Sequence, residues 1–171
     1  MNLQELYKKH GSAVYRLALH YVQNSEDAQE ITQDVFVAVF EHMSDFRGEA
    51  QISTWIHRIT INKSLDFLRH RKRKKRFASV FSIFTQNQEA IEIPHFDHPG
   101  ILLESQEEMK FIFDAINQLP EQQKTALILM KLENLSQQEA AEIMKISTKA
   151  VESLISRAKQ KLKELLAKEN K

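Results

Sequence analysis

The chain has 171 residues, of which 42% are hydrophobic, and it contains no cysteine. The absence of cysteine excludes a disulfide scaffold, a thiolate zinc site and a cysteine nucleophile. Only three glycines and three prolines occur, so turns are few, elements are long, and the pattern predicts an all-α protein. No apolar run reaches the roughly 20 residues of a membrane span, and the polar residues 1–10 do not resemble a signal peptide. We therefore expect a cytoplasmic protein.

The net charge of +1 conceals a strong alternation along the chain. Counting Lys and Arg against Asp and Glu, the four successive segments carry −4 (1–45), +8 (46–76), −6 (77–119) and +3 (120–171). Basic surfaces favour phosphate backbones, and acidic surfaces favour other partners. The alternation indicates two basic surfaces separated by an acidic connector.

Hydrophobic periodicity predicts two helical domains joined by a flexible linker. In the first domain, residues 1–76, helices are expected over 3–22 (interrupted near Gly11), 25–44 and 53–76. The pattern is lost over 77–101, which we interpret as the linker and domain boundary because it contains Pro94, Pro99 and Gly100. In the second domain, residues 102–171, helices are expected over 102–119, 121–133, 136–144 and 148–168.

The end of the chain has the plan of a helix-turn-helix. Ser136 and Glu139 form a capping box for a short helix, and a three-residue turn leads to a longer amphipathic one. The first turns of such a second helix reach base edges in the major groove, and later cations meet phosphates. The alternative is an ordinary solvated face. The candidate DNA contacts are Ser147, Thr148, Lys149, Glu152, Ser153, Ser156 and Arg157.

The second predicted helix has an unusually wide apolar arc of about 180–200°, which is expected to be buried in a small bundle and includes Phe36 and Phe40. The remaining stripe is an acidic ridge with one apolar residue inside it, formed by Glu30, Gln33, Asp34, Val37 and Glu41. A solvated stripe and a docking ridge for a basic partner explain this pattern equally well.

The third predicted helix couples an apolar face containing Trp55 to a series of polar side chains. This series mixes donors and acceptors, which suits single-stranded or unstacked bases; it comprises Arg58, Asn62, Lys63, Asp66 and Arg69. Seven cations in residues 69–76 would make binding to nucleic acid steeply salt-dependent. The basic run is also compatible with a solvated helix end, an RNA or membrane tether, or a contact with the acidic linker.

Taken together and in this order, these segments resemble the extracytoplasmic-function (ECF) sigma factors of bacteria. The family's polymerase-docking helix is similar to residues 27–36 (DAQEITQDVF). Its promoter-melting segment is similar to 46–49 (FRGE), 53–59 (STWIHRI) and Asn62. Its C-terminal helix-turn-helix is similar to 119–122 (LPEQ), 135–141 (LSQQEAA) and 151–158 (VESLISRA). The match covers most of the chain.

The resemblance implies a role for each candidate residue. The acidic ridge of five residues would dock on the largest subunit of core RNA polymerase. The last helix would read the minus-thirty-five element of promoter DNA with its seven candidate residues. The minus-ten element would be opened and read by Arg47, Gly48, Glu49, Ser53, Thr54, Trp55, Arg58, Asn62, Lys63 and Arg69. The family usually has an anti-sigma partner, often membrane-bound, and the resemblance implies no cofactor, metal or small-molecule substrate.

One departure from the family pattern concerns base specificity. Members often carry Gly-Thr-Val-Lys at the start of the recognition helix, whereas this chain has Glu152 in the basic position and Leu154 where a second cation is frequent. Glu152 either accepts a hydrogen bond from a cytosine amino group or merely lowers the local positive potential.

Two other functional classes compete with this interpretation. A helix-turn-helix regulator with an N-terminal protein-interaction domain would bind DNA without polymerase, but it leaves the Trp55 segment and the acidic ridge unexplained. An enzyme is disfavoured because the seven histidines are scattered and no nucleophile–base pairing is visible. A metal site in the linker is also disfavoured, because metal sites need a held geometry; its ligands would be Glu92, His95, Asp97 and His98.

Overall fold

The computed structural model describes residues 2–85, 96 and 105–169, and over these residues it is helical and contains no strand. This confirms the all-α prediction. The helices are α1 (Leu3–Val22), α2 (Ser25–Glu41), the 3₁₀ turn η1 (Met43–Asp45), α3 (Ile52–Thr85), α4 (Gln106–Asn117), α5 (Glu121–Leu127), the π-helical turn η3 (Ile128–Leu132), α6 (Gln137–Met144) and α7 (Thr148–Glu169). Within these ranges no helix is both long and apolar enough to cross a membrane.

The first three helices form a bundle with its own apolar core. Between α1 and α2 the chain reverses through Gln23, which has a left-handed φ of 50°, and Asn24 caps α2 by accepting a hydrogen bond from the Asp27 amide at 2.9 Å. Two buried hydroxyls on α3, Thr60 and Ser64, each donate to the carbonyl four residues earlier, so they need no further partner inside the bundle. The centre of the core is filled by Leu17, Tyr21, Ile31, Val35, Val39 and Ile56.

The last helices form a second unit around the helix-turn-helix. The capping box is present as predicted. The Ser136 hydroxyl oxygen accepts a hydrogen bond from the Glu139 amide, and the Glu139 carboxylate accepts one from the Ser136 amide at 2.8 Å. Lys145 ends α6 in the left-handed region at φ 55°. Small residues let α6 and α7 approach closely. The most deeply buried residues of this unit include Ile128, Leu129, Ala140, Val151 and Ala158.

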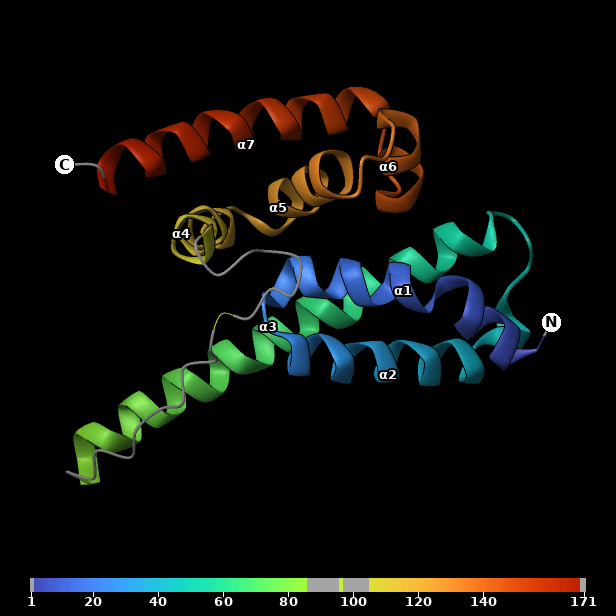
Figure 1. Ribbon diagram of the computed structural model, residues 1–171, viewed down its shortest axis with the longest axis horizontal. Coiled ribbons are helices and arrows are strands. Elements are labelled where there is room, and N and C mark those ends of the chain that lie inside the picture. The colour runs from blue at the N-terminus through green and yellow to red at the C-terminus, as the bar shows by residue number, and fades with distance from the viewer. Residues whose placement is uncertain (1, 86–95, 97–104, 170–171) are drawn as a thin grey trace.

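The two units are stacked, with α4–α7 lying as an upper layer over α1–α3 (Figure 1). Their interface contains a buried polar cluster. The Tyr21 hydroxyl lies 2.7 Å from the Thr125 hydroxyl, and the buried Lys124 ammonium donates to the Tyr21 carbonyl at 3.3 Å and to Asn117 at 2.6 Å. Desolvation raises the pKa of Tyr21, so its phenol is protonated and available for this hydrogen bond.

Three local predictions were wrong. The third helix does not end at Arg76 but continues to Thr85, since residues 77–85 contain no proline or glycine to end it and the next proline is Pro94. Figure 1 shows this end of α3 projecting beyond α2. Helix α1 is uninterrupted at Gly11. Phe40 was expected in the buried arc but is 67% exposed, since α1 and α3 cannot cover the full width of that arc.

Candidate nucleic-acid interface

The seven candidate residues on and before the last helix are all exposed. Ser147 caps this helix by accepting from the Ala150 amide at 3.1 Å, and Gln137 of α6 donates to the Thr148 carbonyl at 2.6 Å. Arg157 is held along the helix by the Ser153 hydroxyl at 3.0 Å. The start of α7 is therefore fixed against α6 while its outward face is free to meet a partner, as a recognition helix requires.

The loop before α3 presents Arg47, Gly48 and Glu49 to solvent. Gly48 has a φ of 73°, a conformation that favours glycine. The Phe46 and Trp55 rings lie 5.2 Å apart and are tilted by 42°, so the loop closes over the start of α3 through an aromatic contact. Ser53, Thr54 and Trp55 are half-buried at this junction.

Further along α3, Arg58 points into the interface between the two units. Its guanidinium donates to the Glu142 carbonyl at 2.6 Å and to the Ile143 carbonyl at 3.2 Å, at the end of α6. A groove of about 480 Å³ lies here between α3 and the C-terminal unit, and Asn62 is exposed within it. Lys63, on the same helix, is half-buried. Thus the C-terminal unit already contacts part of the predicted minus-ten surface.

Arg69 makes a second contact between the units. Its guanidinium forms a bidentate pair with Glu121 of α5, at 2.5 and 3.0 Å, and also contacts Asp66 at 2.9 Å. The hydrogen bond from Arg69 lowers the pKa of Glu121. Beyond this point the cations of the basic run are exposed from Lys72 to Arg76, whereas Arg71 pairs with Asp27 of α2 at 2.8 Å.

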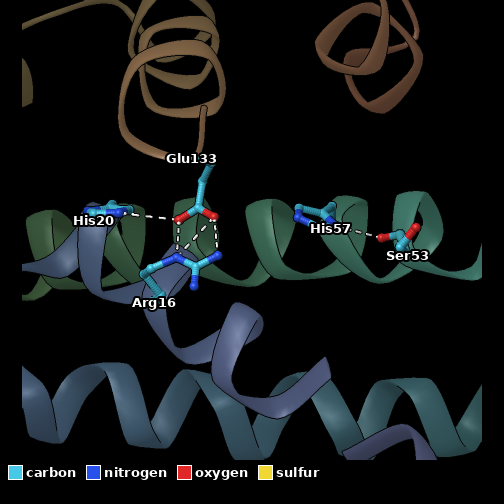
Figure 2. Close-up of polar contacts among 5 residues, drawn as sticks. All are labelled: Arg16, His20, Ser53, His57 and Glu133. Carbon is cyan, nitrogen blue, oxygen red and sulfur yellow. Dashed lines mark hydrogen bonds and ion pairs between the residues drawn. The ribbon is translucent and has the colours of Figure 1, made fainter. Parts of the chain in front are cut away.

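A buried polar contact between the units involves residues that the sequence analysis missed. Glu133, just after η3, reaches down to α1 and binds Arg16 at 2.8–3.2 Å and His20 at 3.2 Å (Figure 2). Its side chain is only 2% exposed. Desolvation by itself would raise the pKa of Glu133, but the hydrogen bonds from His20 and Arg16 outweigh it and lower that pKa to about 2. The carboxylate is therefore ionised at neutral pH.

The same view shows another histidine, His57, which lies on α3. The His57 ring lies 2.7 Å from the Ser53 carbonyl, within its own helix, so this contact organises the start of α3 rather than joining the two units. No local sequence signal marks Glu133 or Arg16, because their contact spans 117 positions.

The acidic ridge on α2 is open to solvent at all five of its predicted residues, Glu30, Gln33, Asp34, Val37 and Glu41. Val37 is 55% exposed, and Phe40 beside it is 67% exposed. An exposed aromatic next to an exposed aliphatic side chain, flanked by carboxylates, is typical of a protein-docking surface. The proposed linker ligands Glu92, His95, Asp97 and His98 lie outside the described residues.

Two family models match the chain in the order that the motifs predicted. The model of Sigma-70 region 2 matches residues 6–74, and that of Sigma-70 region 4 matches residues 112–162. The ECF RNA polymerase sigma-E factor of Haemophilus influenzae is 30% identical over 156 residues, covering 91% of this chain and 82% of that protein. This chain belongs to the ECF family of RNA polymerase sigma factors. The sigma-E factor of Escherichia coli K12 is also 30% identical, over 86% of this chain and 77% of its own.

Solved structures share the fold of this sigma factor. CnrH, in complex with the cytosolic domain of CnrY, aligns with a TM-score of 0.67 and 25% identity over 96% of this chain and 87% of its own. RpoE of Bartonella quintana, in complex with the anti-sigma factor NepR, aligns with a TM-score of 0.64 and 23% identity over 96% and 95%. This sigma factor is thus a transcription initiation factor that directs RNA polymerase to promoters, which displaces the alternative of a polymerase-independent regulator.

Proposed function

We propose a division of labour between the two units of this sigma factor. The N-terminal domain, residues 1–76, docks on core RNA polymerase and opens the minus-ten element. The C-terminal domain, residues 102–171, reads the minus-thirty-five element as duplex. The observation that carries this proposal is the exposure of the complete recognition face of α7 together with the complete acidic ridge of α2, since these surfaces lie on different domains and have different chemistry.

The acidic ridge is the proposed polymerase-docking surface. Its carboxylates, Glu30, Asp34 and Glu41, would meet a basic partner surface, while Val37 supplies apolar contact at the centre. Phe40 extends this apolar contact, because its exposed ring lies about one helical turn after Val37, which is also exposed, and after the buried Phe36. An apolar anchor inside a charged rim is the usual anatomy of a stable protein interface.

The minus-ten surface consists of the 46–55 loop and the polar series on α3. Arg47, Gly48, Glu49, Ser53, Thr54 and Trp55 surround the Phe46–Trp55 contact, and Arg58, Asn62, Lys63 and Arg69 continue along the helix. Capturing an unstacked base costs a few kcal/mol, which edge and stacking contacts must offset. Aromatic rings beside mixed donors and acceptors can supply both kinds of contact.

The recognition face of α7 would read the upstream element through Ser147, Thr148, Lys149, Glu152, Ser153, Ser156 and Arg157. The short side chains at its start allow close approach to base edges, and Arg157 lies further along, where phosphates are met.

Run-off transcription with purified core polymerase tests the proposal as a whole. Adding the protein is expected to produce discrete promoter-dependent transcripts that core alone does not make. The variant Asp34→Lys reverses charge on the ridge and is expected to abolish co-purification with core, while circular dichroism shows an unchanged helical fold because Asp34 is exposed. Unchanged co-purification would refute the docking role. Glu5→Lys, an equal charge change at an exposed site on α1, is the matched control and should bind core normally.

We also propose that an anti-sigma protein regulates this factor and that the factor itself works in the cytoplasm with the polymerase. The support is the likeness to CnrH, which was solved in complex with the cytosolic domain of CnrY. A partner of this kind, often membrane-bound in the family, is expected to compete with core polymerase. Adding such a partner to the run-off reaction should reduce transcription in proportion to its amount.

A further inference from the structure

We propose that the C-terminal domain is itself a ligand of the minus-ten surface, so that promoter DNA and α5–α6 compete for the same face of α3. This inference rests on the proposed minus-ten role of Arg58, Asn62 and Arg69. It adds to that role a closed form of the free protein, in which protein oxygen atoms occupy the donors that DNA would otherwise use.

The first competing contact is the end of α6. The Arg58 guanidinium donates to two carbonyl oxygens, those of Glu142 and Ile143. The last carbonyls of a helix lack intrahelical partners and carry partial negative charge. To Arg58, the end of α6 therefore offers acceptors of the same kind as the oxygens of a base edge or a phosphate.

The second competing contact is the Glu121 carboxylate. Arg69 donates hydrogen bonds to it from two nitrogen atoms, Nε and Nη2. The planar guanidinium fork fits a carboxylate and a phosphate with the same bidentate geometry. As long as Arg69 holds Glu121, its fork is not available to a phosphate.

The third contact lies outside the predicted DNA surface and holds the domains together. The carboxylate of Glu133 is almost fully shielded from solvent and is bound by Arg16 and His20 of α1. Removing one partner of a buried ion pair leaves an uncompensated buried charge, which is strongly unfavourable. Nearby, the Tyr21–Thr125 hydrogen bond is also buried, so the closed interface is organised rather than a loose apposition.

The dimensions of promoter DNA require this interface to open. Elements named for positions about 25 base pairs apart lie roughly 85 Å apart along the duplex. A compact chain of 171 residues has a radius of gyration of only about 16 Å. The closed form can therefore present α7 to duplex DNA but cannot reach both elements at once. The 20 residues between Thr85 and Gln106 span up to roughly 70 Å when extended, which is enough to let the domains separate.

The test measures the distance between the domains in the full chain. Because the protein has no native cysteine, the pair Lys8→Cys and Lys161→Cys allows specific labelling with two dyes at exposed sites on α1 and α7. Energy transfer between the dyes reports closure. The double variant Glu121→Gln/Glu133→Gln removes the carboxylate that competes for Arg69 and the carboxylate that holds the domains together. The control Glu107→Gln/Glu164→Gln makes the same change of net charge in the same domain, at exposed sites on α4 and α7.

Two readouts are expected to move together in the first double variant. Energy transfer should fall, and affinity of the free protein for a probe with a single-stranded minus-ten region should rise at least about fivefold, because apparent affinity scales with the fraction of open molecules. The control should stay within about twofold of the parent on both readouts, since a general charge effect would move both variants alike. The probe is taken from a promoter that is active in the run-off assay.

Three outcomes would overturn the inference. These are low energy transfer in the parent protein, unchanged DNA affinity despite lower energy transfer, or concentration-dependent energy transfer that shows the contact forming between two copies of the chain. If the Glu133 substitution unfolds the C-terminal domain, Arg16→Gln tests the same ion pair from the other side at a side chain that is 54% exposed. Run-off transcription separates the two proposals: activity without these shifts removes only the closed form, whereas inactivity of both parent and variants removes the proposed function.

Discussion

The outward face of α7 is open to solvent along its whole proposed DNA contact, whereas the proposed minus-ten face of α3 already carries α5 and α6. Among the described residues, no hydrogen bond or ion pair joins Glu152 or Arg157 on α7 to the other domain, but Arg58 and Arg69 on α3 each bind an oxygen atom of it. An amphipathic pattern thus identifies a binding face without showing what occupies it. Substitutions that affect binding of DNA and binding of the other domain separately test this contrast.

The largest effect is expected from Asn62→Ala. Asn62 is exposed in the groove, and within the described residues no hydrogen bond joins it to α6, so its loss should affect DNA alone. A side chain that reads a base edge contributes about 1–3 kcal/mol. Promoter opening by the holoenzyme should therefore drop roughly tenfold while initial duplex binding is retained, as measured by permanganate footprinting. Normal melting would contradict the assignment.

Arg58→Ala is the companion variant on the same face. It should also impair opening, but unlike Asn62→Ala it should lower energy transfer between the domains, because it removes both hydrogen bonds to α6. If both variants left energy transfer unchanged, Arg58 would not contribute to closure.

An intermediate effect is expected from pH, through Lys124. Burial, followed by repulsion from Lys72 and Arg71, lowers the pKa of Lys124 to about 7, although Glu121 acts in the opposite direction. When the domains separate, the ammonium regains water and its pKa returns toward 10.5. The closed form thus binds fewer protons between these values, so closure becomes more favourable as pH rises from 7, by at most about tenfold per pH unit.

Energy transfer in the labelled full chain should accordingly increase between pH 7 and 9. The groups facing Lys124 are Tyr21, Asn117, Glu121, Arg71 and Lys72. Lys124→Met removes the titrating group and should flatten the profile. A rise of the same size in this variant would assign the effect to another group.

The smallest effect is expected on the open face. Glu152 is exposed and forms no hydrogen bond or ion pair with α3 in the described part of the chain, so Glu152→Ala should leave energy transfer unchanged. If it reads a base, loss of one edge contact worth about 1–3 kcal/mol should relax preference at one position of the upstream element by several fold. A promoter library that returned the same ranked sequences would show that Glu152 acts only through its charge.

Local chemistry made much of this molecule predictable. The capping box of Ser136 and Glu139, the turn before α7 and the exposed face of that helix follow from residue types and spacing within one turn or two. The acidic ridge was equally visible. Which apolar side chains are buried was harder to predict. Phe40 has the right angular position for the core, but no neighbouring helix covers it.

Contacts between the domains could not be predicted in the same way. Glu121 and Glu133 occupy ordinary positions in a helical pattern, and their partners Arg69 and Arg16 lie 52 and 117 positions away. No local rule couples residues at such separations. The end of α3 was missed for another reason. The apolar periodicity is lost after Arg76, which suggested a linker, but no proline or glycine ends the helix before Thr85.

The π-helical turn η3 has a consequence for how this contact between domains tolerates a change in chain length. Its wider ring is closed by a hydrogen bond from the Glu133 amide to the Ile128 carbonyl, five residues back, at 2.9 Å. A turn of this kind accommodates one residue more than an α-helical turn. Deleting a single residue from η3 would restore ordinary winding with little rotation of Glu133 around the axis, because five residues of a π-turn and four residues of an α-turn both advance by slightly more than one full rotation. The wider turn thus absorbs one residue locally, so that gain or loss of a codon at this position could be tolerated while Glu133 keeps facing Arg16.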